Sequence, residues 1–125
     1  KQKVIEKPET IATAIRIGNP VNRKKAKNAK DESNGLFDSI TDEEIKKAHR
    51  LLAAKEGVFV EPASAAPVAG LIKLSKEKPE LIEGKRIVAV LTGNGLKDQE
   101  FVLDNYSIPD AVQGNLNKVE EIINI

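Results

Sequence analysis

Residues 86–98 of the chain read Arg-Ile-Val-Ala-Val-Leu-Thr-Gly-Asn-Gly-Leu-Lys-Asp. The apolar run 87–91 shows no alternation with polar residues, which is typical of a strand covered on both faces, as in a parallel sheet. It stops at Thr92, and the two glycines that follow permit backbone angles that a Cβ forbids. We therefore expect Thr92 at the carboxyl edge of a sheet, where open α/β sheets bind their ligands. A plain junction between a strand and a loop is the alternative interpretation.

A second strand is predicted at Val58-Phe59-Val60, which ends at Glu61. Pro62 suits the first turn of a helix that the apolar pattern extends to about Lys76. Strand, helix and the strand at 87–91 form a βαβ unit, so the strands should be parallel and the crossover right-handed. Glu61 and Thr92 then emerge at the same edge. The predicted fold is α/β, with three αβα layers around a mostly parallel sheet and a single domain over residues 1–125.

The other elements are expected from local signals. Pro8 and Gly18 suit the first turn and the left-handed cap of a helix, and residues 36–40 suit a short strand. Thr41 and Glu44 form a capping box that opens a helix to about residue 56. Its predicted core residues are Ile45, Ala48, Leu51 and Leu52. The basic segment 22–30 indicates a solvated helix or loop. Phe101, Val102 and Leu103 are expected to face the core, and residues 116–123 to form a short amphipathic helix.

His49 is the only histidine and lies at the margin of the core face predicted for residues 42–56. A lone histidine has no second metal ligand and no catalytic partner in the sequence. We therefore expect a structural, partly exposed side chain. For the same reason we predict no metal site, and no Ser/His/Asp set can be assembled.

Composition excludes several function classes. The chain has 20 basic and 19 acidic residues and a net charge of +1, so no nucleic-acid or membrane partner is expected. No apolar run approaches the ~20 residues that cross a bilayer. Cysteine is absent, which excludes disulfides and thiolate chemistry and fits a cytoplasmic protein. Methionine is absent even at position 1, so we expect the chain to begin inside a longer gene product.

Three segments, in order, resemble the carboxyl-terminal part of the threonine synthase family, which are pyridoxal-phosphate enzymes of the tryptophan-synthase-β fold type. The first is Pro-Glu-Thr-Ile-Ala-Thr-Ala-Ile-Arg-Ile-Gly-Asn-Pro at 8–20. The second is Gly-Val-Phe-Val-Glu-Pro-Ala-Ser-Ala-Ala at 57–66, and the third is Leu-Thr-Gly-Asn-Gly-Leu-Lys-Asp at 91–98. The resemblance runs from about Val4 to Val102 and implies a fold-type-II enzyme.

The resemblance implies four cofactor-binding residues. Thr92 matches the hydroxyl that partners the pyridine nitrogen of the cofactor, and Glu61 matches a carboxylate near the ring. Ala12 and Ala14 match the segment that lies against the ring face. Each has a structural alternative: Thr92 as a turn cap, Glu61 as a loop-bonding glutamate, and the alanines as a close helix-packing surface. No catalytic residue is assigned within the chain.

The sequence departs from the family pattern in places. The lysine that binds the cofactor covalently belongs to a Ser-Phe-Lys-Asp type motif, and no lysine here has that context. The glycine-rich phosphate loop is also missing, because Gly93-Asn94-Gly95 is too short to serve as one. Asn94 stands where the family commonly has histidine, and Asn22-Arg23 where it usually has Ser-Trp. We therefore expect a carboxyl-terminal fragment that is inactive alone.

For the parent protein, the resemblance implies conversion of O-phosphohomoserine and water to threonine and phosphate with pyridoxal phosphate. We expect a cytoplasmic enzyme and a homodimer. Two alternatives stay open. Another fold-type-II enzyme, such as a threonine dehydratase or a cysteate synthase, would share this cofactor wall. The second alternative is a free-standing fragment that has no enzyme activity and acts as an interaction module. The sequence upstream of this chain would separate them.

Overall fold

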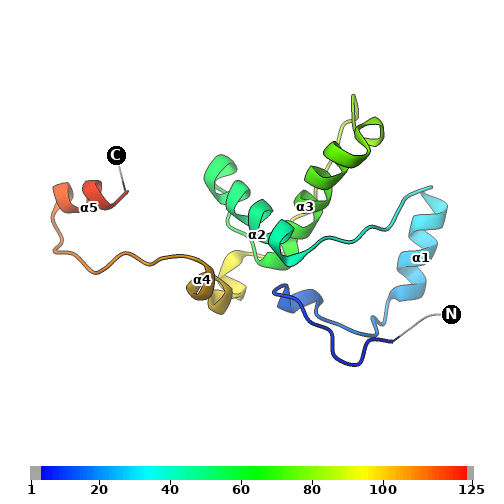
Figure 1. The fold of residues 1–125 in the computed structure, drawn as a ribbon, viewed down its shortest axis with the longest axis horizontal. Coiled ribbons are helices and arrows are strands. Elements are labelled where there is room, and N and C mark those ends of the chain that lie inside the picture. Colours follow the sequence, from blue (N-terminus) through cyan, green and yellow to red (C-terminus); the bar gives the residue numbers. More distant parts are fainter. Residues whose placement is uncertain (1–3, 124–125) are drawn as a thin grey trace.

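The computed structural model describes residues 4–123. Two helices pack against each other in the middle of the molecule, and the other helices lie on either side of this pair (Figure 1). The α-helices are α1 (Arg23–Glu32), α2 (Asp42–Leu51), α3 (Pro62–Glu77), α4 (Gln99–Asn105) and α5 (Leu116–Ile123). Three 3₁₀ turns are η1 (Thr13–Ile15), η3 (Pro79–Leu81) and η4 (Gly95–Lys97), and η2 (Leu52–Glu56) is a π-helical turn that continues α2.

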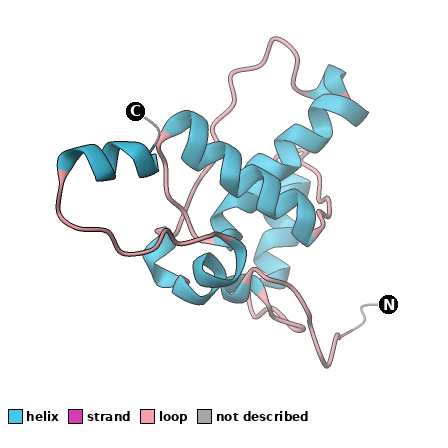
Figure 2. Ribbon diagram, turned by 60° about the vertical axis from the view of Figure 1, so that its left-hand side comes forward, coloured by secondary structure: helices cyan, strands magenta, loops and turns pink. Residues whose placement is uncertain are grey.

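The predicted parallel sheet is not confirmed, because no strand occurs within residues 4–123 (Figure 2). Residues 36–40 and 87–91 are extended chain without strand pairing, so both strand predictions are wrong for this structure. The segment 58–60 contributes only a single bridge, which joins Val60 to Asn94 and is antiparallel. The parallel βαβ unit predicted between residues 58 and 91 is therefore not formed.

Much of the run 87–91 is exposed, as expected of an apolar segment that has no pairing neighbours. Val88 is 84% exposed and Val90 is 65% exposed, whereas Leu91 packs against the core. A strand that is apolar on both faces is stable only between neighbouring strands and beneath covering helices. The part of the chain that the structure describes places no such neighbours beside residues 87–90.

The core lies between α2 and α3, which pack side by side in the middle of the molecule (Figure 1). Its buried apolar residues are Ala12, Ile45, Ala48, Leu52, Val60, Ala65 and Ala69. Because most of these side chains are small, the two helices approach closely. Pro62 occupies the first turn of α3, where its missing N–H costs no hydrogen bond, as predicted.

The start and end of α2 follow the sequence prediction. Thr41 Oγ1 accepts a hydrogen bond from the N–H of Glu44 at 3.2 Å, and Glu44 Oε2 accepts one from the N–H of Thr41 at 2.6 Å. The capping box is thus confirmed. The helical path continues through η2 to Gly57, whose φ of +64° is a left-handed cap. Leu51, however, is 43% exposed, so its predicted core position is wrong.

The helix predicted over residues 8–18 is wrong, because only η1 is helical there. Asp42 at the start of α2 holds this segment: Thr10 Oγ1 donates to Oδ1 at 2.6 Å and Ile11 N–H donates to Oδ2 at 3.2 Å. Gly18 is no left-handed cap. Instead, a Cβ there would lie 1.6 Å from the carbonyl oxygen of Ile5, so glycine allows two backbone segments to touch.

The expected partial exposure of His49 is also wrong, since it is 2% exposed. Its Nε2 lies 2.8 Å from the carbonyl oxygen of Val60, and its Nδ1 lies 2.5 Å from the hydroxyl of Tyr106. A carbonyl only accepts, so Nε2 carries the proton and Nδ1 accepts from Tyr106. Phe101 packs edge-on against the same ring and is buried, as predicted, but Leu103 is 60% exposed. His49 on α2 thus contacts Phe101 on α4, Tyr106 at the end of α4, and Val60.

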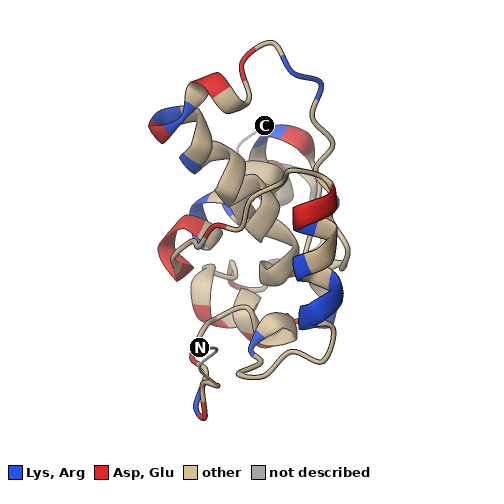
Figure 3. Cartoon of the chain, turned by 90° about the vertical axis from the view of Figure 1, so that its right-hand side faces the viewer, with Lys and Arg blue, Asp and Glu red and all other residues tan. Residues whose placement is uncertain are grey.

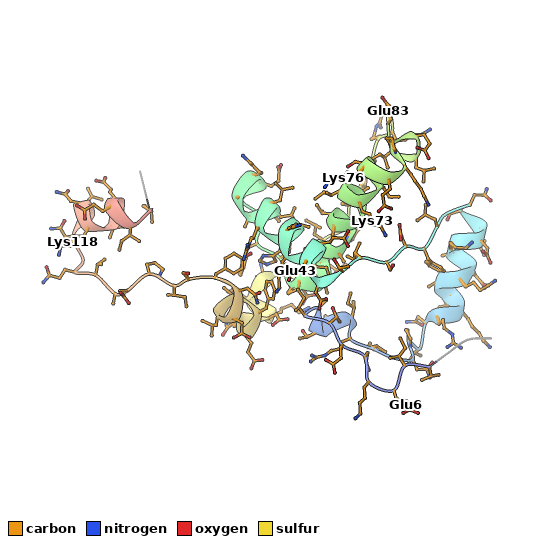
Figure 4. The ribbon with its side chains drawn as sticks, viewed as in Figure 1. Glu6, Glu43, Lys73, Lys76, Glu83 and Lys118 are labelled. Carbon is orange, nitrogen blue, oxygen red and sulfur yellow. The ribbon has the colours of Figure 1, made fainter. Side chains whose placement is uncertain are left out.

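The basic segment 22–30 is mostly helical. The basic residues of the segment 22–30 lie on α1 (Figure 3), which has no buried residue and lies to one side of the central helices α2 and α3 (Figure 1). A helix was one of the two outcomes predicted for this segment. Lys73 projects from α3 (Figure 4), and its ammonium donates to Asp38 at 2.9 Å and to the carbonyl of Ser39 at 2.8 Å. This contact ties the extended segment 36–40 to α3. The helix α5 has the predicted bounds.

The first prediction concerns the capping box. Thr41→Ala removes the acceptor for the Glu44 N–H, so we expect the free energy of unfolding to fall by about 1 kcal/mol. Thr41→Ser keeps the hydroxyl and should lose far less. Urea denaturation followed by circular dichroism measures both variants. Equal losses for alanine and serine would contradict the role of the hydroxyl.

The second prediction concerns pH. Burial lowers the pKa of His49, the Val60 carbonyl partly opposes this shift, and the Arg50 charge adds to it. In the unfolded chain the pKa returns to about 6.5. The unfolded state therefore binds the proton more readily, and the stability contributed by neutral His49 is lost as pH falls from about 6.5 through the lowered pKa. Thermal unfolding between pH 5 and 8 should show this loss. His49→Gln should flatten the profile, and an unchanged slope in the variant would refute the assignment.

Candidate functional site

Residues 92–95, which we call the glycine turn, hydrogen-bond to the segment that leads into α3. The N–H of Gly95 donates to the carbonyl of Phe59 at 3.2 Å, and the N–H of Glu61 donates to the carbonyl of Gly93 at 3.1 Å. The N–H of Gly93 donates to the hydroxyl of Ser64 at 2.7 Å. These bonds bring the second and third motif segments together, so Glu61 and Thr92 converge as predicted, although through an antiparallel bridge.

Both glycines of the turn lie in close contact with a neighbouring side chain. A Cβ on Gly93 would lie 2.1 Å from Oε1 of Glu61, and a Cβ on Gly95 would lie 2.5 Å from the ring of Phe59. Both positions are buried. Asn94, between them, is exposed and accepts a hydrogen bond from the N–H of Leu96 at 2.9 Å, which caps η4. The spacing of the two glycines therefore serves packing, and Asn94 serves the local turn.

Thr92 lies at the surface, above a buried serine. Its Oγ1 is 3.1 Å from Oγ of Ser64, which is 1% exposed, while Thr92 itself is exposed. The Thr92 hydroxyl thus has one fixed protein partner, and it belongs to an exposed residue. An exposed hydroxyl with one fixed partner can still donate to an acceptor such as a ring nitrogen.

Glu61 is only 6% exposed, and its side chain packs against Gly93. Its Oε2 lies 3.6 Å from Nζ of Lys97, a charged partner for a nearly buried carboxylate. Glu61 is also the residue that precedes α3, although its side chain makes no capping hydrogen bond. The carboxylate therefore lies directly behind the glycine turn and faces Lys97.

The structure separates the two alanines that the sequence grouped. Ala12 is fully buried and belongs to the core, whereas Ala14 in η1 is exposed. Thr13 Oγ1 donates to Oδ2 of Asp98 at 2.8 Å, which links η1 to the residues just after η4. All three motif segments thus meet near the start of α3, with Ala14 rather than Ala12 at the surface.

These residues fit one part of a pyridoxal-phosphate site. Thr92 supplies a hydroxyl of the kind that partners a pyridine nitrogen, and Ala14 supplies an exposed small side chain in η1.

Residues 4–123 hold no set of three or more His, Cys, Asp or Glu side chains placed to bind a metal ion. None of the helices in this range is long and apolar enough to cross a bilayer.

A hollow of the described residues lies elsewhere. It has a volume of about 830 Å³ and lies between α1 and residues 35–37, lined by basic side chains of α1 and by Leu36 and Phe37. Lys27 and Lys30 in its wall already pair with Asp31, at 2.8 and 2.9 Å. Because Thr92 does not line this hollow, its volume is not evidence for a ligand beside the glycine turn.

Sequence reasoning missed Ser64, Thr13 and Asp98. A signal for Ser64 was present: it is a hydroxyl within the apolar run 62–69, three residues after Glu61 and therefore almost one helical turn beyond it. Thr13 and Asp98 are 85 positions apart, and no local pattern connects them.

Comparisons with known proteins agree with the three motifs. A family model described as pyridoxal-phosphate dependent enzyme matches residues 1–93. The threonine synthase of Halalkalibacterium halodurans is 53% identical over 115 residues, which cover 92% of this chain and 32% of that protein. The threonine synthase of Synechocystis is 58% identical over 101 residues, 81% of this chain and 26% of that protein. The threonine synthase of Methanocaldococcus jannaschii is 49% identical over 116 residues, 93% of this chain and 28% of that protein.

The third prediction tests the glycine turn. Gly93→Ala forces a methyl group onto the Glu61 carboxylate, so the side chain or the turn must shift, and we expect about 1–3 kcal/mol of destabilisation. Gly70→Ala is the matched control, because it lies within α3 and has open space around its Cβ position. That variant should be neutral or stabilising by up to about 1 kcal/mol. Equal behaviour of the two variants in thermal unfolding would contradict the close contact at residue 93.

Proposed function

Because the chain belongs to the family of pyridoxal-phosphate dependent enzymes, we propose that it is the carboxyl-terminal part of a threonine synthase. In this proposal the full-length enzyme converts O-phosphohomoserine and water to threonine and phosphate. The chain spans 26% to 32% of the relatives described above, and these proteins are named threonine synthases. The observation that carries the proposal is the meeting of the three motif segments beside the exposed residue Thr92.

Thr92 is the proposed partner of the cofactor ring. When bound, pyridoxal phosphate supplies an electron sink for carbanion chemistry. The hydroxyl of Thr92 would hold the ring by donating a hydrogen bond to its pyridine nitrogen. A carboxylate at this place would instead hold the nitrogen protonated and strengthen the sink. A hydroxyl therefore moderates the electron demand of the ring.

The other predicted site residues take different roles. Ala14 is the proposed contact to the ring face, since it is exposed in η1. Ala12, the residue before η1, packs in the core and so anchors η1 to it. Glu61 holds the glycine turn through its contacts to Gly93 and Lys97, and so places Thr92. All four predicted site residues remain in the proposal, two near the ring and two behind it.

The remainder of the site comes from the rest of the proposed enzyme. It supplies the lysine that binds the cofactor and the phosphate-binding loop, which have no counterpart among the motifs of this chain. The exposed run 87–90 is the proposed pairing edge for strands of that remainder, which would complete the three-layer fold with a mostly parallel sheet. A cytoplasmic homodimer belongs to the same proposal. The absence of cysteine is compatible with a reducing compartment.

The fourth prediction tests function in the full-length enzyme. Thr92→Ala leaves the ring nitrogen without its donor, a loss of about 1–3 kcal/mol that should appear as weaker cofactor binding and slower turnover. Thr92→Ser keeps the hydroxyl and should be mild. Phosphate release from O-phosphohomoserine and detection of threonine measure turnover.

Three outcomes would contradict this account in different ways. Ammonia and an oxo acid formed from threonine would indicate a dehydratase, and sulfite-dependent turnover would indicate a cysteate synthase. If Thr92→Ala lowers stability but leaves cofactor affinity and turnover unchanged, the ring-partner role of Thr92 is wrong.

A further inference from the structure

We propose that Ser64 is a positioning residue that sets the direction of the Thr92 hydroxyl proton, so that Thr92 donates toward the cofactor ring. This inference rests on the proposed function. Ser64 lies in the first turn of α3, two positions after Pro62, and is 1% exposed. It contacts two consecutive residues of the glycine turn, Thr92 and Gly93.

The two contacts of Ser64 differ in chemical character. The N–H of Gly93 can only donate, so at 2.7 Å the Ser64 oxygen accepts from it. The second contact, 3.1 Å to Oγ1 of Thr92, joins two hydroxyls, and either one could be the donor. The direction of this second bond decides what Thr92 can offer to a ligand.

Burial settles the direction. The Ser64 hydroxyl proton needs an acceptor, because a buried unpaired O–H group is costly. Among the described residues the hydroxyl of Ser64 has only two hydrogen-bond partners, and the N–H of Gly93 cannot accept. Ser64 therefore donates to Thr92, and no buried side-chain N or O atom within residues 4–123 is left without a partner.

A Thr92 oxygen that accepts from Ser64 keeps its own proton for another acceptor. Thr92 is exposed, so this proton points to the open side, where the proposed site places the pyridine nitrogen. Donated hydrogen bonds also polarise one another along a chain, which strengthens the outer bond. Ser64 thereby favours the unprotonated form of the ring nitrogen, although it does not contact the ring in this proposal.

A double-mutant cycle in the full-length enzyme separates positioning from a merely structural role. The variants are Ser64→Ala, Thr92→Val and the pair together. Two quantities are measured: the affinity of the apoenzyme for pyridoxal phosphate, and the ¹⁵N chemical shift of the labelled pyridine nitrogen across pH. Ser64→Ala should weaken affinity about threefold to tenfold and raise the pH at which the ring nitrogen becomes protonated. In the Thr92→Val background, Ser64→Ala should change neither quantity further.

Two further variants keep the test decisive. Ser75→Ala removes another hydroxyl of α3, which is exposed and donates to the carbonyl of Ile72, and it should leave both quantities unchanged. Ser64→Cys retains a weak donor of similar size and should give intermediate values if the alanine variant does not fold. Additive effects in the cycle, or an unchanged ¹⁵N profile in Ser64→Ala, would overturn the positioning role. Failure of the proposed function is seen separately, as an unmutated enzyme that neither binds pyridoxal phosphate nor forms threonine.

Discussion

The hydrogen bonds between the glycine turn and the start of α3 are the constraint on which the candidate site depends. They join residues 59–64 to residues 92–95, and the short Ser64–Gly93 bond is buried between them. Gly93 and Gly95 have no side chain where Glu61 and Phe59 lie, which lets the two segments pack closely. One small junction thus places the Thr92 hydroxyl at the surface and the Glu61 carboxylate behind it.

Signals that are complete within a few residues predicted structure well. The capping box at Thr41, the proline at the start of α3 and the bounds of α5 all agree with the structure, because each depends on neighbours in sequence. The convergence of Glu61 and Thr92 was also predicted. The expected reason was a parallel sheet, but the observed contact is an antiparallel bridge at Val60.

Features that depend on distant partners could not be predicted from local pattern. Apolar residues 87–90 suit a buried strand, but a strand requires neighbours that the described residues do not place there. The helix expected at 8–18 is replaced by side-chain bonds from Asp42, and His49 is buried by its contacts to Val60 and Tyr106. Ser64 stands out locally as a hydroxyl within an apolar run, but its partners Thr92 and Gly93 are 28 and 29 positions away, so its role could not be predicted.

The most direct test of the central claim is a crystal structure of the full-length enzyme with bound pyridoxal phosphate. The account predicts that Oγ1 of Thr92 lies within hydrogen-bonding distance of the pyridine nitrogen, about 2.7–3.0 Å. It also predicts that Ser64 retains its bonds to Gly93 and Thr92. A ring nitrogen that contacts a carboxylate instead, or that lies far from the glycine turn, would contradict the account.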